Sequence, residues 1–369
     1  MSINRDFADL ARSSQPGRNM LINGSMAIAQ RGSLTGQGGA DFYTTCDRWK
    51  LDDTAGAQAR YTTSQGTSGG VSGKDPWLSI NVTTAEAAVA SGEKNGWNQF
   101  VEGNNTRQII NSSGQMKASA VSFDVKFKKG VGSSLSAPYT MCMTLICENN
   151  AYGWVEEISI TADDTWEHKS FDITALAQAA SDVDTSSGYR LQFMMFAGTT
   201  YNDGSAGWNS NGGGDPATSN QDNLADATGN ILGITNVQWE VDGGTEFEHE
   251  DIGTALNRCY RYYERLTPNT ATNQAIFQAY NAISTVASGI FNYTHKRAAP
   301  TLTFTAGATF EVRHEVATAV CTNASLSGST DEDRCLCNFT VSSGLTSGEG
   351  CVIRRNDTDT TYIEVSAEL

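Results

Sequence analysis

The sequence predicts an all-β chain built from antiparallel sheets that pack face to face. Alternation of apolar and polar residues recurs along the 369 residues, whereas helical periodicity is rare. The composition agrees, because 36 glycines, few prolines and many Ser, Thr and Asn residues are typical of short strands joined by turns. This length leaves room for two or three domains, each with its own core.

The clearest strands have one apolar side and one polar side. This pattern occurs in VSFDVKFK (121–128), VQWEV (237–241) and TLTFT (301–305). A polar side exposed to solvent and an apolar side turned inward are what two packed antiparallel sheets require. YRLQFMMF (189–196) is apolar on both sides towards its end, which predicts a central strand that is covered on both faces.

Net charge and cysteine spacing exclude several classes of function. The formal charge of -16 is unsuited to neutralising nucleic-acid phosphates or binding an anionic membrane. No run of apolar residues is long enough for a signal peptide or for insertion into a membrane. None of the eight cysteines forms a C-x-x-C pair, so we expect mostly free thiols that pack as small buried hydrophobes.

The acidic stretch EFEHED (246–251) raises the question of a metal site or of catalytic carboxylates. A zinc site built on His249 in an H-E-x-x-H pattern needs a second histidine at Gly253, so we predict no metal there. A chain with 41 acidic residues also contains many accidental carboxylate pairs. The sequence shows no P-loop motif and no nucleophile with a recognisable base, so we predict no enzyme and no cofactor, although a polysaccharide depolymerase stays an alternative.

A structural role explains the same stretch better. Asp251 is placed to cap a helix, and Glu248 and Glu250 lie at its positive end. Arg258 and Arg261 fall near the negative end of that helix. We therefore interpret the stretch as a connector between two β-domains.

The long polar loop 199–230 holds the best candidates for ligand binding. A loop of this length in a compact domain is usually functional or disordered. Trp208 lies within it, near Tyr201 and Asn209. Its ring either anchors the loop or contacts a glycan, and the first role is favoured because a polar loop needs an apolar side chain to fix it to the domain. Trp97 and Trp154 are further candidates for glycan contact.

Three segments resemble a family of bacteriophage tail-fibre proteins. NMLINGSMAIAQRG (19–32), followed by DRW (47–49), resembles the opening of these proteins. The segment from VQWEV to RCYRYYER (237–265) resembles their central motif, and KRAAPTLTF (296–304) with YIEVSAEL (362–369) resembles their ending. Each motif alone is weak, but their order and spacing extend the resemblance over nearly the whole chain.

This sequence departs from the family pattern at a few positions. Glu250 stands where the family usually has arginine, and Lys296 where it has methionine.

The first domain also resembles a carbohydrate-binding-module-like jelly roll, whose successive strands are similar to SFDVKFKK, TWEHKSFDIT and YRLQFMMFAGTTY. Many such modules hold calcium near an N-G-D-F-E segment, but NGSMA (23–27) lacks both carboxylates, so we predict no calcium site there.

The resemblance implies a domain order. We expect an N-terminal anchoring segment (1–18), a β-jelly roll (19–245), a short connector helix (246–258) and a C-terminal β-sandwich (259–369).

The resemblance also implies a function. We expect a virion structural protein, made in the host cytoplasm and placed on the virion exterior as a tail fibre or similar appendage. A homotrimer would present several copies of each loop to host cell-surface carbohydrate, and the N-terminal segment would contact other virion proteins. A head fibre or decoration on the capsid exterior is the alternative.

Overall fold

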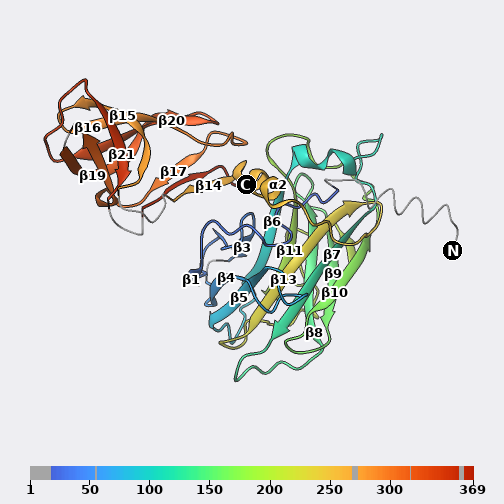
Figure 1. Cartoon of the computed structure of the whole chain (residues 1–369). Helices are drawn as coiled ribbons and strands as arrows, with labels where there is room; N and C mark the ends of the chain where they lie inside the picture. The colour runs from blue at the N-terminus through green and yellow to red at the C-terminus, as the bar shows by residue number, and fades with distance from the viewer. Residues whose placement is uncertain (1–17, 55, 268–272, 316, 357–360) are drawn as a thin grey trace. The chain divides into compact units, whose positions relative to one another are not determined.

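The computed structural model describes residues 18–54, 56–267, 273–315, 317–356 and 361–369. The predicted anchoring segment therefore lies outside the described residues, except for Arg18. Contacts divide the chain into two compact units, one with the described residues up to Leu256 and one spanning Asn257–Glu368. The fold is all-β, as the alternation predicts (Figure 1).

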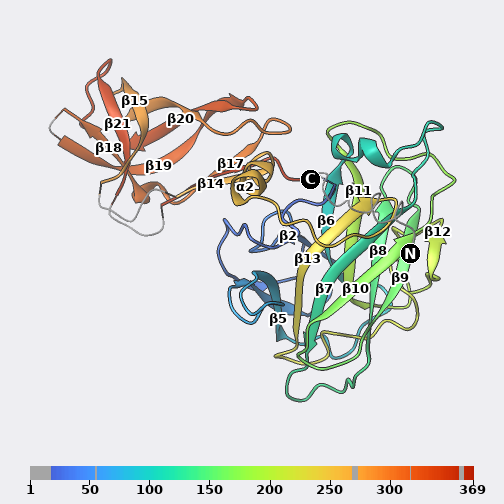
Figure 2. The ribbon, with the colours of Figure 1, turned by 45° about the vertical axis from the view of Figure 1, so that its right-hand side comes forward.

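The first unit is a jelly-roll-like sandwich of two antiparallel sheets. One sheet has six strands in the order β1 (Leu34–Gln37), β4 (Arg60–Gly66), β5 (Trp77–Thr84), β13 (Ile231–Val241), β7 (Ser119–Lys128) and β10 (Glu167–Ile173). The other has seven strands in the order β12 (Gly207–Asn209), β9 (Gly153–Ile160), β8 (Tyr139–Cys147), β11 (Ser187–Ala197), β6 (Lys94–Glu102), β3 (Lys50–Asp53) and β2 (Phe42–Tyr43). A 3-10 helix, η1 (Gly103–Ile109), follows β6 (Figure 2).

The core of this unit lies between the two sheets. The apolar residues of β7 that were predicted to face inward, from Val121 to Phe127, are fully buried, and so is Trp239 of β13. The predicted central strand is β11, between β8 and β6. Its Met194 is covered on the outer side by Ala217 of the long polar loop, so both faces of the strand are buried at that end.

The N-terminal motif serves the fold. The side chain of Asn23 accepts a hydrogen bond from the Ile28 amide and donates to the carbonyl oxygens of Ile28 (2.9 Å) and Asp47 (3.0 Å). The carboxylate of Asp47 in turn accepts from the Gln30 amide and lies 3.5 Å from Arg31 Nη1. The N-G and Q-R-G parts of the motif are therefore joined to D-R-W by side-chain hydrogen bonds.

The same segment is tied to the last strand of the sandwich. Asn19 donates from Nδ2 to the Val237 carbonyl (3.0 Å), and its Oδ1 accepts from the Trp239 amide (3.1 Å). Gly24 runs so close to this strand that a Cβ atom there would lie 2.0 Å from the Val237 carbonyl oxygen. Only glycine fits a backbone approach of this kind.

The predicted connector contains α2 (Ile252–Tyr260). Asp251 caps this helix, because its Oδ1 accepts hydrogen bonds from the amides of Gly253 (2.9 Å) and Thr254 (3.2 Å), as predicted. Within the described residues, no helix is long and apolar enough to cross a membrane.

The second unit combines a small sheet with a closed barrel. The small sheet has the order β14 (Tyr263–Leu266), β22 (Ile363–Ser366) and β17 (Thr301–Phe304). The 3-10 helix η2 (Gly307–Thr309) comes directly before β18. The barrel has six strands, in the order β15 (Ala275–Ile283), β16 (Val286–Asn292), β20 (Arg334–Val341), β19 (Ala317–Thr330), β18 (Phe310–His314) and β21 (Gly350–Arg355).

All eight cysteines are free and buried, which confirms their predicted role as packing residues. Cys335 and Cys337 share a buried side of β20 with Phe339 and Val341, as the alternation predicts.

Candidate functional site

The strongest candidate site lies on the outer side of the seven-stranded sheet, where β3, β6 and β11 are neighbours. Trp97 of β6 is in register with Leu51 of β3 and Phe193 of β11, and all three side chains are buried in the core. Because successive side chains of a strand point to opposite faces, the residues next to these three face outward. We give the name polar face to five polar residues on this outward side of the three strands: Asp52, Lys94, Asn98, Arg190 and Gln192.

Asp52 is the centre of the polar face. Its Oδ2 accepts hydrogen bonds from Lys94 Nζ (3.0 Å), Arg190 Nη1 (3.1 Å) and Gln192 Nε2 (3.0 Å). Burial raises the pKa of Asp52, but Lys94 and Arg190 outweigh it and hold the pKa below its usual value. The carboxylate therefore stays ionised at neutral pH, which makes it unsuited to act as a general acid.

The cations of the polar face are already paired with carboxylates. Arg190 Nε lies 2.9 Å from Glu148 Oε1, in addition to the bond from its Nη1 to Asp52. Lys94 shares the same Asp52 oxygen. A negatively charged ligand would have to compete with these two carboxylates, so the electrostatics favour an uncharged ligand.

Two amide side chains in the polar face have atoms that lack hydrogen-bond partners. Asn98 and Gln192 are paired across β6 and β11, and both residues are 0% exposed. Among the described residues, neither Nδ2 nor Oδ1 of Asn98 has a partner, and Gln192 Oε1 has none either. Buried polar groups normally have partners, so these atoms keep unused capacity to hydrogen-bond a molecule that reaches them.

Gly96 makes room for the amide of Gln192. A Cβ atom at Gly96 would lie 2.5 Å from Gln192 Nε2 and 3.0 Å from the sulfur of Met194. The glycine in KNGWNQF therefore lies inside a strand, where it allows a neighbouring side chain to lie over the backbone.

Aromatic rings lie beside the polar face. The half-buried ring of Phe100 has Lys50 Nζ at 5.2 Å and Arg190 Cζ at 5.3 Å from its centroid. Tyr201, a predicted contact residue from the long loop, has Lys94 Nζ at 5.4 Å from its ring centroid. Amides, charged groups and aromatic rings together form the kind of surface that recognises hydroxylated ligands.

Trp154 and Trp208, two other predicted contact residues, lie against each other away from these contacts. They are directly opposite on β9 and β12, with ring centroids 5.8 Å apart in an edge-to-face arrangement. Trp208 Nε1 donates to the Thr174 carbonyl (2.9 Å), and both rings are partly buried against the core. Trp208 thus holds the long loop to the sheet, and whether it also contacts a glycan stays a prediction.

The remaining two predicted residues have structural surroundings. Asn209 closes its own loop, because Nδ2 donates to the carbonyls of Ser205 (2.6 Å) and Gly207 (2.8 Å). Trp97 is 0% exposed and packs edge-to-face against Tyr61, with centroids 5.3 Å apart. The prediction of Trp97 as a contact residue is therefore wrong, because Trp97 lies on the inward side of β6, in the core.

Sequence reasoning missed all five polar-face residues, of which four lie on β6 and β11 and one, Asp52, lies on β3. The available signal was the alternation in β11, where Arg190 and Gln192 separate the apolar residues Tyr189, Leu191 and Phe193. β6 carries no such pattern.

The acidic stretch 246–251 supports the structure. Glu248 Oε2 accepts hydrogen bonds from the backbone amides of Arg18 (3.2 Å) and Asn19 (3.4 Å), while its own amide donates to Gln238 Oε1 (2.7 Å). In the described part of the chain, no group of three or more His, Cys, Asp or Glu side chains could hold a metal ion.

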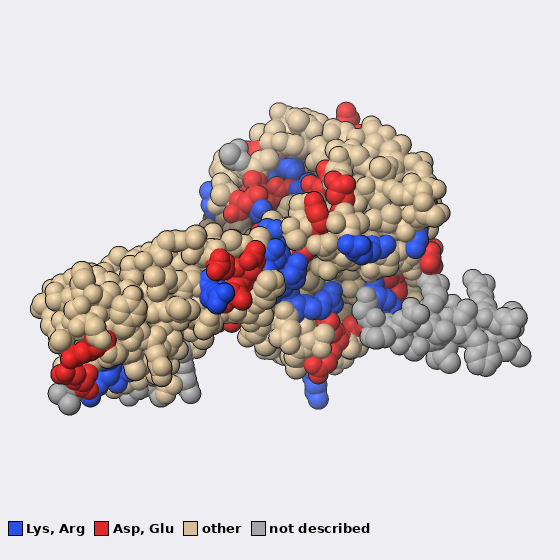
Figure 3. All heavy atoms as spheres, turned by 90° about the horizontal axis from the view of Figure 1, so that it is seen from above, with Lys and Arg blue, Asp and Glu red and all other residues tan. Residues whose placement is uncertain are grey.

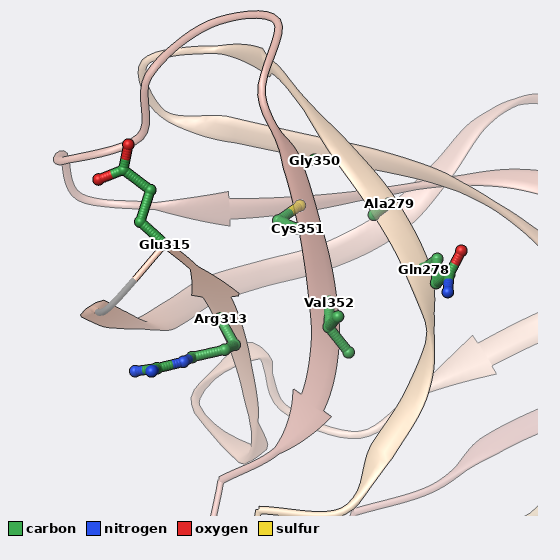
Figure 4. Close-up of a pocket in the computed structure, with 7 residues that line it drawn as sticks. All are labelled: Gln278, Ala279, Arg313, Glu315, Gly350, Cys351 and Val352. Carbon is green, nitrogen blue, oxygen red and sulfur yellow. The ribbon is translucent and has the colours of Figure 1, made fainter.

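A pocket of ≈ 370 Å³ in the barrel is a weaker candidate. Figure 4 shows that the side chains of Arg313 and Glu315, which line this pocket, extend away from Cys351, which also lines it. Burial raises the pKa of the Cys351 thiol to about 11, so the thiol is protonated at neutral pH and is a poor nucleophile.

Comparisons with known proteins assign no family to this chain. No family model matches this chain, and no curated protein matches it. Similar solved structures include TmCBM61 in complex with beta-1,4-galactotriose (10% identity, 61% of this chain, 99% of that chain, TM-score 0.28) and a CBM4 structure (11%, 60%, 98%, 0.28). The CBM22-1–GH10 modules of Clostridium thermocellum Xyn10B with xylohexaose are similar at 12% identity, over 59% of this chain and 30% of that one, with a TM-score of 0.28. These neighbours contain carbohydrate-binding modules, but similarity at this level carries no argument about ligand or activity.

Proposed function

We propose that this chain is an attachment protein that binds a neutral saccharide on a cell surface through the polar face, without cleaving it. The unpartnered amide of Asn98 and the unpartnered Oε1 of Gln192 carry this proposal. A sugar hydroxyl both donates and accepts, so it, or a water that bridges to it, satisfies the amide groups that the protein leaves unpaired. Phe100 and Tyr201 supply aromatic surface nearby for the apolar side of a sugar ring.

The motifs at both ends of the chain support a role on a bacteriophage virion, as a tail fibre or similar appendage. The alternative of a capsid-exterior fibre differs in location alone. Labelled antibody against the chain, viewed on intact virions by electron microscopy, should mark the tail; label on the capsid would establish the alternative, and unlabelled virions would contradict both.

The binding test uses purified full-length chain, neutral polysaccharide from the host surface and isothermal titration calorimetry. We expect Asn98→Leu to weaken binding by at least about tenfold, because it removes one amide worth about 1.5 kcal/mol in hydrogen bonds. The unfolding free energy should stay the same or rise, since Asn98 loses no protein partner.

Asn281 offers a matched control in the second unit. It is also 0% exposed, and its amide also lacks partners among the described residues. Asn281→Leu should have a similar effect on stability and none on binding. Equal affinity of wild type and Asn98→Leu would refute the polar face as the site, and a wild type that binds no host glycan would refute attachment.

A separate measurement addresses the depolymerase alternative. Incubation of the chain with the same polysaccharide should leave its chain length unchanged, as measured by size-exclusion chromatography. Shortening that persists in highly purified protein would establish an enzyme.

A further inference from the structure

One outer surface of the barrel is free of charge. β15 and β16 contain no Asp, Glu, Lys or Arg, and β20 contains only Arg334, at its first position. In the whole sequence 18% of the residues are charged, so such a run across three neighbouring strands is unusual. Figure 3 shows a broad uncharged surface over this unit.

The outward side chains of these strands form one continuous surface. Tyr280, Ser288 and Asn338 are directly opposite one another, and Ile290 is opposite Leu336 in the next outward row. We call this surface the neutral face: Tyr280, Ile283, Ser288, Ile290, Leu336 and Asn338. The alternate residues of the same strands, such as Phe291 and Phe339, are buried in the barrel core.

The neutral face exposes large apolar side chains to solvent. Tyr280 is 50% exposed, Ile283 54% and Ile290 58%. Single exposed hydrophobic residues are common on protein surfaces, but neighbouring ones indicate an interaction surface. A partner that covers them should itself be apolar and uncharged, because no charged group on this face could pair with one of its own.

We propose that the neutral face packs against the same face of other copies of this chain. Each copy carries a formal charge of -16, so copies repel wherever charged surfaces meet. Two neutral faces do not repel each other, because neither carries charge. A second copy has the same sequence and therefore has an uncharged, apolar surface of the same kind. A symmetric oligomer uses one patch on every subunit in this way.

The test is the molecular mass of the full chain by sedimentation equilibrium at about 50 µM, a concentration at which micromolar interfaces are occupied. Wild type should be a multimer, and its association should strengthen from low to high salt because salt screens the charge repulsion. Ile290→Glu and Tyr280→Glu should each weaken association by at least tenfold. Both side chains are at least half exposed, so the variants should keep the circular dichroism and melting temperature of the wild type.

Val131→Glu is the matched control. Val131 is fully exposed in the first unit, so this variant adds the same charge away from the neutral face and should associate like wild type. A monomeric wild type, or a multimer that survives both barrel substitutions, would overturn the proposal. Monomeric variants should still bind soluble oligosaccharide with wild-type affinity and bind cells less tightly, so failure here is distinguishable from failure of the glycan site.

Discussion

Asn98 in the first unit and Asn281 in the second are equally buried and equally short of hydrogen bonds, but their surroundings differ. Asn98 lies in a row with Gln192 and Lys50, beside the ion pairs of Asp52. Asn281 is opposite Ala287, whose side chain lies in the barrel core. An unpartnered amide therefore does not define a site by itself; the polar, charged and aromatic groups around Asn98 distinguish it.

The outer faces of the two units also differ in their charge. The polar face carries paired charges, whereas the neutral face carries none. Both rest on buried aromatic side chains, so differences between the units should arise from their surfaces. The following predictions test this comparison, from the largest expected effect to the smallest.

The cores beneath the two faces should be equally important. Trp97→Ala below the polar face and Phe339→Ala below the neutral face should each lower the free energy of unfolding by about 3–5 kcal/mol, because both leave cavities in packed cores. Urea denaturation measures both effects. A loss well below 1 kcal/mol at either position would show that its core is not packed as described.

The contribution of the polar face to the stability of the first unit should depend on Asp52. Asp52→Asn should cost about 1.5–3 kcal/mol at pH 7, since three donors lose a charged acceptor. The folded-state pKa of Asp52 is lowered, so its contribution is complete above the ordinary value of about 3.9 and disappears as the pH falls through the lowered pKa. Urea titrations of both proteins should therefore converge in acid; a difference independent of pH would contradict this origin.

The second unit has a buried charge outside its barrel strands, at Lys296. This residue is 0% exposed and donates from Nζ to Glu264 Oε2 (2.9 Å) and to the Tyr260 carbonyl at the end of α2. Lys296→Met, which introduces the residue of the tail-fibre pattern, should change stability at pH 7 by about 1 kcal/mol or less, because burial of the charge offsets much of its pairing.

The pH dependence of the stability of wild type and Lys296→Met tests whether burial of the Lys296 charge causes this small difference. Burial lowers the pKa of Lys296 despite Glu264, so between that pKa and about 10.4 the unfolded chain binds more protons than the folded one. Wild-type stability should therefore rise with pH relative to Lys296→Met across this window. A difference that falls with pH would contradict the burial of a charged lysine.

Thiol chemistry should show the smallest effect. With a pKa of about 11, Cys351 is ionised to about one part in a thousand at pH 8, and all eight cysteines are buried. A chromogenic disulfide reagent should detect almost no thiol in the folded chain and eight in urea. Rapid reaction at a barrel cysteine would show that the second unit opens more readily than the first.

Local patterns predict much of this fold. The alternation in 121–128 and 237–241 identifies β7 and β13, and Asp251 signals the start of α2. These features depend on residues close in sequence, where period and capping chemistry are readable.

The site was harder to predict because it joins distant segments. Asp52, Asn98 and Gln192 lie on three strands, and nothing local to them specifies that β3, β6 and β11 are neighbours in register. Trp208 and Asn209 were predicted because an aromatic residue in a polar loop is conspicuous, but Trp208 Nε1 bonds the Thr174 carbonyl after β10 and Asn209 bonds its own loop.

The closed barrel has a consequence for how large an assembly can grow. Its six strands pair in a ring, so the barrel offers no unpaired strand to which another copy could add by backbone hydrogen bonds. Copies that meet at the neutral face must do so through side chains, and each has one such face. An assembly of this kind fills its contacts and stops, whereas strand addition can continue indefinitely into a fibril.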